Sequence, residues 1–153
     1  MTNNLENLKE SLDVLISIAQ LDIDDAHAYD QAISNLGDEE IKAKFTLFKS
    51  DHERHILELS KLIKELEGKP PEYSRDFKGY LISGYTAVRS MMGTKGALEA
   101  MQTNEKMTVK RYEEALQNNL NPMARELLTK NLQEERLHLK FIENALSSEI
   151  WKK

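Results

Sequence analysis

The sequence has 153 residues, four histidines, no cysteine and a formal net charge of −5, from 21 Lys and Arg against 26 Asp and Glu. This length fits one domain with a single core, and the acidic balance argues against a nucleic-acid partner, which requires a basic surface. Without cysteine the chain cannot form a disulfide or a thiolate metal site, so any bound metal must be held by His, Asp and Glu.

Glycine and proline divide the chain into four long segments. These residues occur only at Gly37, between Gly68 and Gly96, and at Pro122. The segments between them are rich in Leu, Ala, Glu, Lys and Gln, which favour helix. We expect helices over residues 3–36, 38–67, 97–120 and 123–148. Asp38 is a plausible N-cap of the second helix, and Asn121 before Pro122 is a plausible N-cap of the fourth.

The two short breaks predict two antiparallel hairpins, the first helix with the second and the third with the fourth. The stretch from Gly68 to Gly96 is too long for a simple turn. We therefore expect a crossover along the bundle, which places the third helix parallel to the second. A short amphipathic helix is predicted within the crossover from the helical spacing of Phe77, Leu81, Tyr85 and Val88. The expected fold is all-α, a single four-helix-bundle domain over residues 1–153.

Each helix has an apolar stripe of residues spaced by three and four, and each stripe contains ionisable side chains. Asp22 continues the stripe of the first helix, and Glu105 lies in the stripe of the third. The second helix has two histidines three residues apart, and the fourth has a Glu-x-x-His sequence. The six residues of this predicted layer are Asp22, His52, His55, Glu105, Glu135 and His138.

Counting from the turns places these side chains at similar heights in the bundle. Asp22 precedes Gly37 by as many positions as His52 follows it. Glu105 and Glu135 lie almost equally far from Asn121, the N-cap expected for the fourth helix. Residues at equal distances from a hairpin turn meet at the same level, so each hairpin brings its polar residues together near its middle. Buried ionisable groups are costly unless they neutralise one another or hold cations, so the layer predicts one or the other.

One acid from each of two helices, with a three-spaced pair from each of the other two, resembles the ligand pattern of ferritin-like di-iron and di-manganese proteins. Rubrerythrin and bacterioferritin are the best-known comparisons, and the resemblance covers the whole four-helix core. In those families the acids of the first and third helices stand seven residues before a tyrosine. The same spacing occurs here from Asp22 to Tyr29 and from Glu105 to Tyr112.

The Glu-x-x-His motif of the fourth helix is intact as Glu135 and His138, whereas the second helix departs from the family pattern. His52 stands where the families have a bridging Glu, and His55 matches the usual histidine. Glu53 is the other residue that could replace the missing Glu. The segment EGKPPEY and the crossover after it also resemble an uncharacterised bacterial ferritin-like domain family, many of whose members have lost some of these ligands.

The resemblance implies a metal-binding protein with one or two ions of Fe, or of Mn, while Zn could occupy the same ligands in a purified sample. Asp22, Glu105 and Glu135 supply three negative charges, against the four usual for two divalent ions. This leaves either an unusual di-metal site or one strong and one weak position. The implied chemistry is of the oxidase, peroxidase or ferroxidase type, without a choice among them and without identified catalytic residues. The alternative is a non-catalytic scaffold, such as a coat, stress or assembly protein, in which the layer only sets helix register.

Several residues outside the layer also carry expectations. We expect solvated positions for His27 and for the flanking acids Asp25, Asp51, Glu53 and Glu134, and docking of Trp151 on the bundle or on a partner. We expect a homo-oligomer, with a dimer favoured, and an external electron donor if the site is redox-active. No membrane partner is expected because the longest apolar runs are only a few residues. The start of the sequence has no basic or apolar stretch of an export signal, which indicates the cytoplasm.

Overall fold

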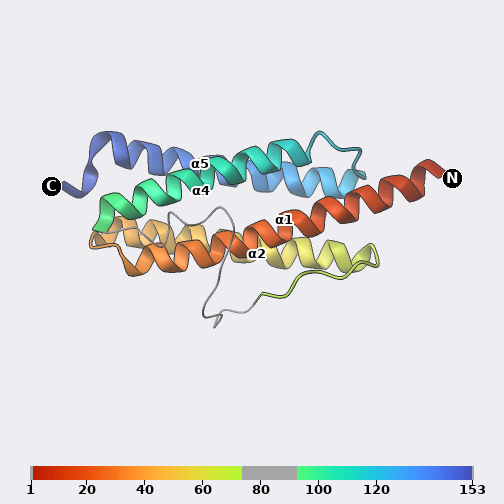
Figure 1. Cartoon of the computed structure of the whole chain (residues 1–153), viewed down its shortest axis with the longest axis horizontal. Helices are drawn as coiled ribbons and strands as arrows, with labels where there is room; N and C mark the ends of the chain where they lie inside the picture. Colours follow the sequence, from red (N-terminus) through yellow and green to blue (C-terminus); the bar gives the residue numbers. More distant parts are fainter. Residues whose placement is uncertain (1, 74–92, 153) are drawn as a thin grey trace.

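The computed structural model describes residues 2–73 and 93–152. In these ranges the chain forms four long helices and a short 3-10 helix, with no strand (Figure 1). They are α1 (Thr2–Ser34), α2 (Glu39–Glu65), α4 (Gly93–Ala115), α5 (Pro122–Ser148) and η1 (Ile150–Lys152). The prediction of an all-α four-helix bundle is confirmed.

The N-terminal ends of α2 and α5 are capped as predicted. Asp38 accepts a hydrogen bond from the Ile41 backbone N–H at 3.0 Å. Asn121 likewise accepts one from the Ala124 N–H at 2.8 Å, and Pro122 begins the helix. Each side chain thereby satisfies an N–H group that has no partner within its own helix.

The third predicted helix was wrong at both ends, because α4 begins at Gly93 and ends at Ala115. The helix passes through Gly96, although a glycine inside a helix costs about 1 kcal/mol relative to alanine. Burial of the neighbouring residues Ala97 and Leu98 in the bundle core offsets this cost. Past its C-terminal end, the Arg125 guanidinium donates to the carbonyls of Leu116 at 2.9 Å and Asn118 at 2.8 Å. A side chain of another helix therefore satisfies the carbonyls that a longer α4 would have paired internally.

The helices form two antiparallel hairpins, α1 with α2 and α4 with α5, and α1 also packs along α4. Figure 1 shows α2 and α4 running in the same direction, with the end of α2 and the start of α4 at opposite ends of the bundle. The Gly37 N–H in the first turn donates to Thr94 Oγ1 at the start of α4, at 3.1 Å. The expected crossover is therefore confirmed. The short helix predicted from Phe77, Leu81, Tyr85 and Val88 lies outside the described residues.

Two apolar clusters fill the bundle on either side of its middle. One surrounds Tyr29 and Phe45 near the first turn, and η1 places Trp151 against it, so this side chain packs on the bundle. The other surrounds Leu15 and Leu128 near the second hairpin turn. The predicted ionisable layer lies between the two clusters. Among the helices of the described residues, none contains an apolar stretch long enough to cross a bilayer.

Candidate metal centre

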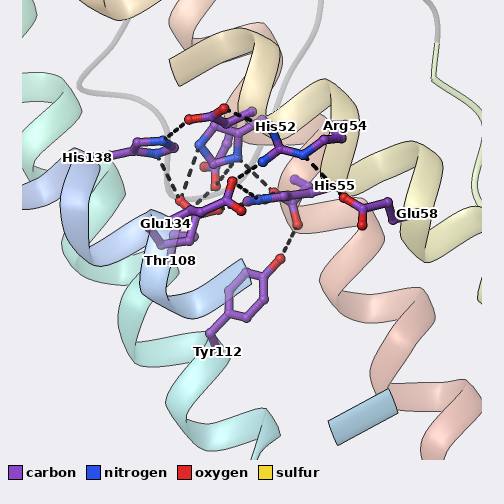
Figure 2. Close-up of polar contacts among 12 residues, drawn as sticks. His52, Arg54, His55, Glu58, Thr108, Tyr112, Glu134 and His138 are labelled. Carbon is purple, nitrogen blue, oxygen red and sulfur yellow. Dashed lines mark hydrogen bonds and ion pairs between the residues drawn. The ribbon is translucent and has the colours of Figure 1, made fainter. Parts of the chain in front are cut away.

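The six predicted layer residues meet in the middle of the bundle, and each is at most 1% exposed. All four long helices contribute, with α2 and α5 supplying two residues each. The close-up in Figure 2 shows the histidine side chains of α2 and α5 converging on this region. Counting residues from the two hairpin turns therefore predicted the height of the layer correctly.

The layer contains two overlapping groups of four residues. In each group, one ligand atom from every residue lies within 4.8 Å of the others. The group that we call the first half-site comprises Asp22, His52, His55 and Glu135. The second half-site comprises His52, Glu105, Glu135 and His138. His52 and Glu135 belong to both, so these two side chains lie between two potential metal positions.

The first half-site is organised around Asp22 Oδ1. This oxygen lies 2.8 Å from His52 Nδ1 and 3.1 Å from His55 Nδ1. Glu135 Oε1 lies 3.2 Å from the same nitrogen of His55. Carboxylate oxygens and imidazole nitrogens from three helices therefore face one small volume.

The second half-site lies on the other side of the His52 ring. His52 Nε2 is 3.2 Å from Glu105 Oε1 and 3.3 Å from Glu135 Oε2. His138 Nδ1 is 3.4 Å from Glu135 Oε2 and 3.8 Å from Glu105 Oε2. Each half-site thus combines one carboxylate of its own, one histidine of its own, and the two shared residues.

Two tyrosines hold the carboxylates of α1 and α4 in a reciprocal arrangement. Tyr112 on α4 donates its hydroxyl to Asp22 Oδ2 on α1 at 2.5 Å. Tyr29 on α1 donates to Glu105 Oε1 on α4 at 2.8 Å. Both rings are fully buried. The seven-residue spacing in the sequence therefore corresponds to a tyrosine of each helix that orients the acid of the other.

The outward nitrogens of two histidines contact carboxylates at the surface of the bundle (Figure 2). His138 Nε2 lies 2.8 Å from Asp51 Oδ2, and His55 Nε2 lies 3.1 Å from Glu134 Oε1. Arg54 forms ion pairs with both of these acids. Asp51 and Glu134 are partly exposed, in line with the solvated faces expected for them, and they also hold the two rings. Such contacts fix the tautomer and orientation of histidines that bind metals.

Two expectations for flanking residues were wrong. Asp25 is fully buried, accepts a hydrogen bond from Thr108 at 2.7 Å, and lies 3.7 Å from His52 Nδ1. Its position three residues after Asp22 was a signal for the same helix face. His27 is only 7% exposed, because the ring of Tyr73 packs on it with centroids 5.4 Å apart. Tyr73 lies after α2, far from His27 in the sequence, so the helical pattern around His27 could not predict that this ring shields it from solvent.

Glu53, the other residue that the sequence offered in place of the missing Glu, lies outside the layer. It is partly exposed and accepts a hydrogen bond from the Tyr73 hydroxyl at 3.0 Å. It belongs to neither half-site, whereas His52 belongs to both. Between the two residues that the sequence left open, the structure therefore places His52 in the layer.

The charges of the layer are strongly coupled through burial and proximity. Burial alone would raise the pKa of Asp22, but the charge of His55 and the hydrogen bonds with His52 and His55 outweigh it and hold the pKa well below its usual range. Burial would lower the pKa of His52, but Glu135, Asp22 and Glu105 raise it well above its ordinary value. Burial raises the pKa of Asp25. In the metal-free layer, charged histidines thus neutralise ionised acids.

Some atoms of the layer make no hydrogen bond to the described residues, although histidine nitrogens lie 3.2–3.8 Å from the carboxylate oxygens among them. Four buried ligand-type atoms make no hydrogen bond within the described parts of the chain: Glu105 Oε2, Glu135 Oε1, Glu135 Oε2 and His138 Nδ1. Buried polar atoms without partners are uncommon in native proteins. Carboxylate oxygens and imidazole nitrogens are ligands that suit iron, manganese and zinc. The residues present therefore fit a bound transition metal.

Comparisons with known proteins agree with this architecture. The family model described as "Domain of unknown function (DUF2383)" matches residues 10–118. A crystal structure of ferritin-like, diiron-carboxylate proteins from Bacillus anthracis str. Ames matches with a TM-score of 0.69 and 21% identity, over 92% of this chain and 97% of that one. The bacterioferritin of Desulfovibrio desulfuricans, whose diiron site was described in different catalytic states, matches with a TM-score of 0.70 and 21% identity, over 92% and 82%. No curated protein sequence matches significantly. The predicted ferritin-like fold is confirmed.

Proposed function

The chain belongs to the family described as Domain of unknown function (DUF2383). We propose that it is a metal-binding protein that holds two metal ions, with iron the favoured metal, in the core of its ferritin-like bundle. The observation that carries the proposal is the pair of overlapping half-sites, which contain four buried ligand-type atoms without hydrogen bonds to the described residues. A buried cation could coordinate each of these atoms, which have only ion-pair contacts within the layer.

The chain's residues divide naturally between the two ions. Asp22 and His55 would hold the first ion, and Glu105 and His138 would hold the second. Glu135 would link them, because its Oε1 faces His55 and its Oε2 faces His138. Both terminal histidines would bind through Nδ1, since their Nε2 atoms contact surface carboxylates. These outer contacts would increase metal affinity by holding the rings in position.

Iron in such a site supplies electron transfer to dioxygen or peroxide. We therefore propose oxidoreductase chemistry of the oxidase, peroxidase or ferroxidase type. The apolar clusters on either side of the layer keep bulk water away from it. The chain has no cysteine to hold an electron-carrying cluster, so repeated turnover would require an external reductant.

Anaerobic iron loading tests the proposal directly. Wild-type protein, loaded with ferrous ions and desalted, should retain about two irons per chain by elemental analysis. The Glu135→Ala, His138→Ala double variant should retain fewer than one, because it removes the shared carboxylate and one terminal histidine. Glu143→Ala, an exposed acid on the same helix, serves as the control and should match wild type. Equal iron content in wild type and the double variant would refute the proposal.

A metal-free scaffold is the second candidate function, and the internal neutralisation of the layer favours it. Asp22 already contacts two histidines and a tyrosine, so part of the layer is satisfied without metal. Thermal unfolding with chelator and with added iron separates the candidates. An ion present at 100 times its dissociation constant adds about 2.7 kcal/mol, which raises the melting temperature of a protein of this size by roughly 5–11 °C. Equal melting temperatures would support the scaffold.

A further inference from the structure

We infer that His52 bridges the two metal positions and binds one ion through each of its ring nitrogens. The inference rests on the proposed metal-binding function and specifies how the two positions are connected. In ferritin-like families the corresponding residue is expected to be a carboxylate. This chain would instead have one bridging imidazole and one bridging carboxylate, Glu135.

The position of the His52 ring is the first argument. Its Nδ1 faces Asp22 Oδ1 in the first half-site at 2.8 Å. Its Nε2 faces Glu105 Oε1 and Glu135 Oε2 in the second, at 3.2 Å and 3.3 Å. The ring is fully buried. Its two nitrogens are thus directed into different half-sites.

The other two histidines of the layer are placed differently. His55 and His138 each direct Nδ1 into one half-site and Nε2 toward a partly exposed acid, Glu134 or Asp51. Each therefore has one nitrogen for a metal and one for a carboxylate at the surface. Among the described residues, every acid paired with a nitrogen of His52 is buried: Asp22, Asp25, Glu105 and Glu135.

Bridging also equalises the two ligand sets. With one nitrogen of His52 in each half-site, every ion has one carboxylate of its own, one histidine of its own, one oxygen of Glu135 and one nitrogen of His52. If His52 bound a single ion, the other ion would have only three of these residues. Four ligands complete a tetrahedral site or most of a larger one.

Charge balance is a separate argument. Two divalent ions carry four positive charges, and ionised Asp22, Glu105 and Glu135 carry three negative ones. A neutral imidazole has one N–H and one free nitrogen, so it can bind only one ion. When both nitrogens bind ions, the one N–H proton of the neutral ring leaves to solvent or to a nearby base, and the resulting imidazolate supplies the fourth negative charge. Asp25, 3.7 Å from His52 Nδ1, could supply the fourth negative charge instead. In that case the distance between the two ions would differ.

The two arrangements differ in the distance between the ions. Ions bound to opposite sides of an imidazole ring, with metal–nitrogen bonds of about 2.0–2.1 Å, are separated by about 6 Å. In two-metal sites without an imidazole ring between the ions the separation is about 3.5–4 Å. If Asp25 balanced the charge, His52 would contact one ion and the shorter separation would be possible.

The decisive experiment is anomalous scattering from crystals of the full chain loaded with Mn²⁺. We expect two peaks in the layer at the longer separation of about 6 Å that follows from metal–nitrogen bond lengths. Each peak should lie within bonding distance of a different nitrogen of His52. A separation of about 3.5–4 Å, a single peak, or two ions with His52 bound to only one of them would overturn the inference. This measurement needs no substitution, so it remains decisive even if a His52 variant does not fold.

Two variants provide matched comparisons. His52→Glu restores the carboxylate of the ferritin-like pattern, and its two ions should approach to about 3.5–4 Å. His27→Gln removes a buried histidine of α1 that belongs to neither half-site, and it should keep the wild-type separation. The same separation in wild type and His52→Glu would overturn bridging while the metal-binding proposal survives. No layer metal in any of the proteins, His52→Glu included, would overturn the metal-binding proposal itself.

Discussion

The hydroxyl of Tyr112 offers a sharp test of how the layer is held together. Tyr112 and Asp22 are both fully buried, and the hydroxyl donates to Asp22 Oδ2 at 2.5 Å. Although burial raises the pKa of this carboxyl, the charge of His55 and the hydrogen bonds with His52 and His55 hold it well below its usual range, so Asp22 is ionised at neutral pH. Tyr112→Phe removes only the donor and leaves the ring in place.

The expected loss of stability follows from the type of hydrogen bond. A hydrogen bond to a charged group contributes about 1.5–3 kcal/mol. The free energy of unfolding of metal-free Tyr112→Phe should therefore fall by about 2 kcal/mol. For a chain of this size, this corresponds to a decrease of about 4–8 °C in melting temperature.

The same change should weaken metal binding in one half-site only. Asp22 belongs to the first half-site and not to the second. Loss of a group that orients a metal ligand typically lowers affinity about 10–100-fold. Tyr112→Phe should therefore bind one ion with nearly wild-type affinity and the other about 10–100-fold more weakly.

Urea unfolding in chelator measures the stability change, and anaerobic Mn²⁺ titration followed by EPR measures the two affinities. Tyr73→Phe is the matched control, because Tyr73 also donates to an acid, Glu53 Oε2 at 3.0 Å, but outside both half-sites. It should lose less stability and leave both affinities unchanged. Wild-type stability in Tyr112→Phe, or equal weakening of both ions, would refute this reasoning.

Three further predictions concern pH, helix capping and core packing. Burial would lower the pKa of His55, but the charge and hydrogen bond of Asp22 and the nearby carboxylate of Glu135 raise it to about 10. Because this exceeds the unfolded value of about 6.5, the stabilisation is complete below about pH 6.5 and is lost as the pH rises toward about 10. The melting temperature of chelator-treated wild type should thus fall more steeply over this range than that of His55→Gln, and parallel curves would contradict the assignment. Asp38→Ala should lose about 1 kcal/mol in urea unfolding with unchanged metal content, whereas a neutral effect would argue against the cap. Leu15→Ala, at a fully buried position, should lose about 2–5 kcal/mol by the same measurement, and a loss below about 1 kcal/mol would indicate a loosely packed cluster.

The helices and the height of the polar layer could be predicted because both depend on local information. Glycine and proline positions set the breaks, and Asp38 and Asn121 cap their helices through hydrogen bonds within one turn. The layer follows from the helical period and from equal distances to a turn. The C-terminal end of α4 was missed because Arg125, on another helix, satisfies the carbonyls beyond Ala115.

The sequence by itself determined that the six ionisable side chains of the predicted layer lie on the inner faces of the helices. Only the tertiary structure decided which group each of their nitrogen and oxygen atoms contacts. Asp25 and His27 lie near the edge of a helical stripe, where a small rotation of the helix or cover from a distant segment changes exposure from high to low. A sequence does not reveal which group each ring nitrogen of His52 contacts. The two nitrogens become different in the bundle because α1 brings an acid to one side of the ring, while α4 and α5 bring acids to the other.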